Sequence, residues 1–286
     1  MNPNWEVALA YNGDELAGAW PRFPTQQWGV SFWRNPPLTP YLGPQFYLPN
    51  GLKGHNRERF TSRITEALLA QFGPLPPVCN VGLEPSFKGA GLLKRSGFEV
   101  AARQTFLLPL AAGPEVLLKA TNENIRRRLR LAAGALQIAE APELIHTLWE
   151  GQQETLQRKG ASGTAHDKAT LERAIMASVA QGQGMLWAAY EDGKVAALLW
   201  SVWDADQAYC LASTQLAGGH QAAVTALIWH AIEAACQRGN AIFDFEGSMD
   251  AGIEHFFRGF GGQLETYLVA RRNKSLLFKL RGLLRK

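Results

Sequence analysis

Two acidic residues in the second half of the chain have the types and spacing of a proton-transfer site. Asp244 and Glu246 alternate with Phe243 and Phe245 in FDFEGS, and side chains two apart on a strand point to one face of a sheet. A carboxylate at the end of a strand can take a proton, directly or through water, from an amine attacking an acyl carbon. Ser248 could donate a hydrogen bond to the resulting oxyanion. Alternatively, one carboxylate binds backbone amides or caps the next helix, and the other is solvated.

A second candidate site lies just upstream, in the turn QLAGGH formed by residues 215–220. The turn joins an apolar run at Tyr209–Ser213, typical of a strand, to a helical pattern over Ala222–Arg238. Backbone N–H groups at the start of a helix can bind a pyrophosphate, and small residues let it approach closely. The alternative is a plain strand-to-helix turn in which the glycines serve only geometry.

The elements around these residues predict an α/β layer. Ala241–Phe245 is typical of a second buried strand, and Gly252–Arg258 of a short helix closed by Gly259. A strand joined to another through a helix implies parallel pairing by a right-handed crossover.

The same order of elements occurs twice in the chain. Hairpins with tips at Asn12-Gly13 and Asp192-Gly193 each precede a long helix, a buried strand, a short helix and a final strand. Internal duplication is the economical explanation. We therefore expect two halves, residues 1–113 and 114–273, followed by a basic amphipathic helix over residues 274–286.

Composition favours a soluble globular protein, with 47% hydrophobic and 19% charged residues among 286. The net charge of +4 belongs to the tail, because seven basic residues and no acid follow Ala270, which leaves 22 basic and 25 acidic residues before it. This argues against a nucleic-acid-binding body. The N-terminus lacks a signal-peptide pattern, so we expect a cytoplasmic protein. Neither the three cysteines nor the six histidines show metal-ligand spacing, which predicts no metal site.

The order of elements, together with FDFEGS and the following GIEHFFRGFGG, resembles the GNAT superfamily of N-acyltransferases. Two such halves in one chain resemble the Fem-type peptidyltransferases and their acyl-CoA-dependent relatives. The resemblance covers essentially the whole chain, and it implies a mixed α/β sheet in two tandem GNAT-like halves, the first of them degenerate.

The resemblance also implies where a donor would bind. The family signature is Gln/Arg-x-x-Gly-x-Gly/Ala between the central strand and the long helix, and Gln215 and Gly218 match it, whereas His220 stands where Gly or Ala is usual. The implied cofactor is acyl-CoA, for example acetyl-CoA, and the implied cofactor-binding residues are Gln215, Gly218, Gly219 and His220. The implied catalytic residues are Glu246, Asp244 and Ser248.

Two basic segments offer further contacts. The cluster Arg126, Arg127, Arg128 and Arg130, on a helix capped by Asn122, could bind phosphates, although a solvated helix face is the more common use of such a cluster. The tail SLLFKLRGLLRK over residues 275–286 has a leucine stripe opposed by basic residues. Such a helix can lie on the inner face of a membrane or pack on its own protein.

Three hypotheses for function follow. The first is an N-acyltransferase that uses acyl-CoA to acylate a primary amine of an amino sugar, amino acid or cell-envelope precursor. The second is a Fem-type enzyme that takes its aminoacyl group from charged transfer RNA and acts on a cell-wall precursor. The third is a non-catalytic GNAT-fold binding module. The oligomeric state stays open.

Overall fold

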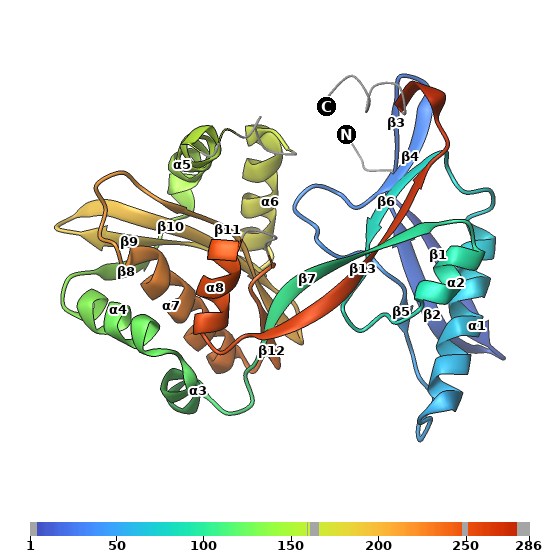
Figure 1. The fold of residues 1–286 in the computed structure, drawn as a ribbon, viewed down its shortest axis with the longest axis horizontal. Helices are drawn as coiled ribbons and strands as arrows, with labels where there is room; N and C mark the ends of the chain where they lie inside the picture. Colours follow the sequence, from blue (N-terminus) through green and yellow to red (C-terminus); the bar gives the residue numbers. More distant parts are fainter. Residues whose placement is uncertain (1–4, 159, 161–165, 248–250, 279–286) are drawn as a thin grey trace. The chain divides into compact units, whose positions relative to one another are not determined.

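The computed structural model describes residues 5–158, 160, 166–247 and 251–278 (Figure 1). The chain forms two compact units, one of residues 1–103 with 266–286 and the other of residues 104–265. The first unit contains β1 (Glu6–Asn12), β2 (Glu15–Arg22), β3 (Pro24–Gln27), β4 (Val30–Arg34), β5 (Gln45–Phe46), α1 (His55–Gln71), β6 (Val78–Gly82) and α2 (Ala90–Arg95). The second contains α3 (Pro114–Ala120), α4 (Glu123–Ala133), β8 (Gln137–Glu140), a 3-10 turn (Pro142–Leu144), α5 (Ile145–Arg158), α6 (Lys168–Ala180), β9 (Gly184–Glu191), β10 (Lys194–Trp203), β11 (Gln207–Gln215), α7 (Ala223–Arg238), β12 (Ile242–Asp244) and α8 (Ala251–Gly259).

The first unit is built on the hairpin predicted around Asn12-Gly13. Strand β2 pairs with β1 and β5, and α1 packs on β1 and β2. The alternation of Ala8 and Ala10 with exposed neighbours gives β1 one buried face, and Trp20 and Trp33 are the largest side chains of the core beneath α1. A second set of strands has the order β3-β4-β6-β13, in which β4 and β6 are parallel.

The second unit has a mixed sheet of order β7-β12-β11-β10-β9-β8. Strand β11 pairs with β12 in parallel through the crossover helix α7, which confirms the predicted pairing. In Figure 1, α5 and α6 lie on one side of these strands, and α4 and α7 lie on the other. The buried face of α7 is almost wholly apolar. It carries Leu227, Ile228 and Ile232, and each of these side chains is no more than 1% exposed.

The last strand of each half pairs in the unit formed by the other half. β7 (Glu99–Pro109) closes the first half of the sequence, yet Leu107–Pro109 pair with β12 in the second unit. β13 (Gln263–Asn273) closes the second half, yet Val269–Asn273 pair with β6 in the first unit. Apart from the short β5 between β4 and α1, the series β4-α1-β6-α2-β7 is thus repeated as β11-α7-β12-α8-β13, with the final strands exchanged. The predicted two-half α/β architecture is confirmed.

Candidate functional site

The central feature of the second unit is the point where two parallel strands separate. β11 and β12 pair only from Gln207↔Ile242 to Tyr209↔Asp244. Beyond this point β11 continues to Gln215, with a register shift against β10 that leaves Leu211 as an extra residue. Such bulges re-aim a strand and are common beside active sites. The two candidate sites predicted from the sequence lie on the two separating segments.

Asp244 holds the backbone on the β12 side. Its Oδ1 accepts hydrogen bonds from the Thr105 hydroxyl (2.6 Å) and from the Glu246 N–H (2.8 Å), and the residue is fully buried. Thr105 Oγ1 in turn accepts from the Gly247 N–H at 3.0 Å. A Cβ on Gly247 would overlap the backbone of Gln104 and Thr105, so only glycine fits this approach. One buried carboxylate thereby orders the backbone from Phe245 to Gly247.

Glu246 is positioned by this turn rather than by the strand. β12 ends at Asp244, and Glu246 has a left-handed backbone with φ 52°. The sequence pattern predicts that Asp244 and Glu246 share one face because both belong to a pleated strand. This reason is wrong, because Glu246 lies beyond the last strand residue. What brings the pair together is the hydrogen bond from the Glu246 N–H to Asp244.

The surroundings of Glu246 disfavour its charge. Burial, and secondarily the charge of Asp244, raise the pKa of Glu246 well above its ordinary value near 4.5. Its Oε1 is buried without a hydrogen-bond partner among the residues that the structure describes. Burial likewise raises the pKa of the neighbouring Cys210 thiol to about 12, with smaller contributions from Glu246 and Asp244. Cys210 is thus a neutral core thiol, and Glu246 is the carboxyl group whose raised pKa makes its carboxylate a stronger base than an exposed one.

The turn between β11 and α7 is tightly built around its glycines. Gly218 has φ 74° and open space where a Cβ would point, whereas a Cβ on Gly219 would collide with the backbone of Ala196. The Gln215 side-chain amide donates to Ala196 O (3.1 Å) and to His220 O (3.3 Å). Gln215 therefore fixes the conformation of the turn.

His220 uses its ring at the start of α7. Its Nδ1 accepts a hydrogen bond from the N–H of Ala222 at 3.2 Å, and Ala222, the N-cap residue of α7, makes no side-chain cap of its own. The N–H groups of Gly218, Gln221 and Val224 donate to no acceptor within the described part of the chain. The turn thus presents unsatisfied donors at a helix N-terminus, which is the arrangement that binds phosphate groups.

Sequence reasoning missed Thr105. It lies on β7, 139 residues from Asp244, and no local pattern marks it as a partner of the FDFEGS segment. Ser248 lies outside the described residues, so its place in the site stays a prediction.

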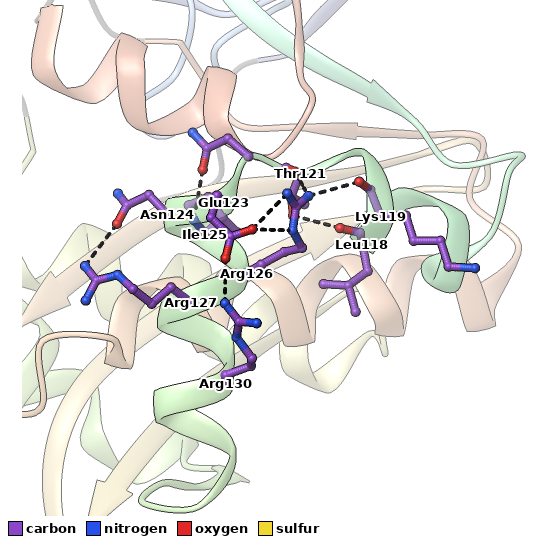
Figure 2. A network of polar contacts seen from close by, with 10 residues as sticks. Leu118, Lys119, Thr121, Glu123, Asn124, Ile125, Arg126, Arg127 and Arg130 are labelled. Carbon is purple, nitrogen blue, oxygen red and sulfur yellow. Dashed lines mark hydrogen bonds and ion pairs between the residues drawn. The ribbon is translucent and has the colours of Figure 1, made fainter.

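The arginine cluster is mostly engaged within its own helix. Figure 2 shows Arg126 and Arg130 reaching the Glu123 carboxylate, at 3.1 and 2.6 Å, and Arg127 reaching Asn124. Arg126 also donates to the carbonyls of Lys119 and Thr121, which joins α3 to α4. Asn122 caps α4 by accepting from the Ile125 N–H, as predicted.

The start of the tail packs on the first unit. Phe278 stacks on Trp28 and meets Phe32 edge-on, with ring centroids 5.8 and 4.9 Å apart, while Leu276 is 77% exposed. The remainder of the predicted amphipathic helix lies outside the described residues. Among the described helices, none has the length and apolar content needed to cross a bilayer. The described residues contain no group of three or more potential metal-ligating side chains.

Comparison with known proteins agrees with this geometry. Residues 119–258 match the family model described as Acetyltransferase (GNAT) domain, and this range contains α4, β11, the glycine turn, α7 and the Asp244–Glu246 segment. No curated protein matches the chain in sequence.

Solved structures extend the match to the whole chain. FemX superposes with a TM-score of 0.67 at 13% identity, covering 99% of this chain and 91% of FemX. A tandem GNAT protein from the clavulanic acid biosynthesis pathway gives 0.53 at 12% identity, with 96% and 86% covered. L-PGS from Bacillus licheniformis gives 0.53 at 12% identity, with 97% and 88% covered. The chain thus has the GNAT-superfamily fold in its duplicated, Fem-type form.

Proposed function

We propose that the protein is an N-acyltransferase that binds acyl-CoA at the turn between β11 and α7 and transfers the acyl group to a primary amine. The observation that carries the proposal is the match of residues 119–258 to the GNAT domain. Within this range, the turn between β11 and α7 contains backbone N–H groups without acceptors among the described residues. A GNAT domain is by itself evidence for acyl transfer as a class of reaction. The acceptor class is the primary amine of an amino sugar, amino acid or cell-envelope precursor.

The chemistry is direct attack. The amine nitrogen forms a bond to the thioester carbonyl carbon, the C–S bond breaks, and the thiolate of CoA leaves. Glu246, directly or through one water, takes the proton that the amine loses, and its raised pKa makes its carboxylate a stronger base than an exposed one. Asp244 stays hydrogen-bonded to Thr105 and positions the Glu246 backbone. Ser248 is the proposed oxyanion donor.

The first test is a calorimetric titration of the full chain with acetyl-CoA and longer acyl-CoAs. Saturable binding that is lost in Gly218→Trp supports the proposal, because the Cβ at this position points into open space beside the turn and a large side chain would fill it. Turnover is then followed as release of free CoA thiol with a panel of amines. Glu246→Gln is expected to bind donor as the wild type does and to lose at least about a hundredfold in rate.

Two other outcomes would replace the proposal. If acyl-CoA does not bind at millimolar concentration and charged transfer RNA does, the Fem-type aminoacyl transfer becomes the function, and its binding should weaken steeply with salt. If neither binds, the chain is a binding module with a GNAT fold.

A further inference from the structure

Arg128 differs from the other arginines of α4 in where its guanidinium lies. Its Nη1 reaches Gln221 O, at 3.4 Å, in the turn that precedes α7. Arg126 and Arg130 are neutralised by Glu123, and Arg127 bonds to Asn124 one turn back on its own helix. Of the four side chains, Arg128 is the one with a hydrogen bond to the segment between β11 and α7, at Gln221, among the residues that the structure describes.

The packing of α4 against α7 explains this direction. Arg128 and Ala132 are four residues apart and share one face of α4. Ala132 is buried against Ala222 and Ala226, at the start of α7. The same helix face that makes this contact therefore carries the Arg128 side chain to the turn, where it is half-buried rather than fully exposed.

The guanidinium of Arg128 is incompletely used there. Arginine has five N–H donors, and within the described residues Arg128 makes one weak bond to a carbonyl and no ion pair. The N–H groups of Gly218, Gln221 and Val224, all within three residues of this contact along the chain, also lack acceptors within those residues. A planar cation that reaches the same segment as several unpaired amides is complementary to a phosphate group, which accepts from both.

We propose that Arg128 binds a phosphate of the donor at the β11–α7 turn and so contributes to the affinity for acyl-CoA. This inference rests on the proposed function. The pyrophosphate and the 3′-phosphate of CoA share the required chemistry, and the choice between them is made by the test.

The test compares Arg128→Ala, Arg128→Lys and Arg127→Ala by calorimetric titration with CoA and with dephospho-CoA, which lacks the 3′-phosphate. Arg127→Ala is the matched control, because it removes the same charge from the adjacent position without a contact to the turn. We expect the dissociation constant to rise about tenfold or more in Arg128→Ala, less in Arg128→Lys, and less than twofold in Arg127→Ala. The melting temperature without ligand should be nearly the same in the two alanine variants, since both lose one solvent-side contact.

The outcomes separate this inference from the proposed function. A loss that is equal for CoA and dephospho-CoA assigns Arg128 to the pyrophosphate, and a loss seen only with CoA assigns it to the 3′-phosphate. If Arg128→Ala binds CoA as tightly as the wild type, the inference is overturned and the proposed function is kept. The same holds if Arg127→Ala loses as much affinity for CoA as Arg128→Ala, because the loss then reflects the general electrostatic field of the helix. Absence of binding by the wild type overturns both.

Discussion

Adding one methyl group at Gly219 tests whether the glycine turn depends on close packing rather than on flexible glycines. The adjacent Gly218 provides a matched control, because it has the opposite constraint. Gly218 needs a left-handed backbone with φ 74° and has open space at its Cβ position. Gly219 has no such backbone demand, but its Cβ would lie 2.5 Å from Ala196 O and 2.8 Å from Ala196 Cα.

The magnitudes of the two changes follow from these distances. Ordinary contact begins near 3.4 Å, so Gly219→Ala must move the turn or β10 by about 0.9 Å. Overpacking of this kind costs about 1–3 kcal/mol. The movement also strains the bonds that Ala196 O accepts from Leu216 N and from the Gln215 side chain, each worth about 1 kcal/mol. The total is about 2–5 kcal/mol, against roughly 1 kcal/mol for a left-handed alanine at position 218.

Urea unfolding followed by far-UV circular dichroism measures both values, and scanning calorimetry gives the melting temperatures. For a unit of this size we expect Gly219→Ala to melt about 4–20 °C below the wild type and Gly218→Ala about 2–4 °C below it. If Gly219→Ala proves as stable as Gly218→Ala, or more so, the turn does not press on Ala196 as the structure has it, and the reasoning fails.

Three further predictions concern the buried carboxyls and the His220 ring that precedes α7. Because the pKa of Glu246 is raised in the folded protein, the folded state holds that proton more tightly than the unfolded state, so wild-type stability should fall as pH rises above about 4.5. Glu246→Gln should therefore stabilise the protein little at pH 4 and increasingly toward the raised pKa, and a pH-independent difference in unfolding free energy would contradict this. Thr105→Val removes the hydroxyl between Asp244 and Gly247 and should cost about 2–3 kcal/mol in urea unfolding, with Thr105→Ser costing clearly less; equal losses would show that packing alone matters. His220→Ala removes the hydrogen bond that the ring accepts from the Ala222 N–H and should lower stability by about 1 kcal/mol while donor affinity is kept, so a large loss of affinity in titration would give the ring a direct role in binding.

Local features of the fold could be predicted from the sequence because short-range geometry determines them. Asp192-Gly193 forms the predicted hairpin tip, with φ 48° and 75°, as a two-residue turn of this type requires. The helix predicted over Ala222–Arg238 is observed over Ala223–Arg238, and it ends at Gly239, which has the left-handed backbone that commonly ends a helix. The exchange of β7 and β13 was not predictable in this way. Both halves end in similar strands, and apolar alternation does not specify which half supplies the pairing partner.

The candidate site shows the same division between local and long-range causes. Residue types made Glu246 a candidate base, which stays a prediction, but strand periodicity gave a wrong reason for its position, since β12 ends before it. Its left-handed backbone is stabilised by Asp244, and Asp244 is stabilised by Thr105 from the other half of the sequence. A buried carboxylate needs such partners, so the isolated motif FDFEGS would not be expected to hold this geometry. It follows that the exchange of β7 is part of the site itself: the strand that the first half contributes to the second unit carries the hydroxyl that holds Asp244, and through it Glu246, in place.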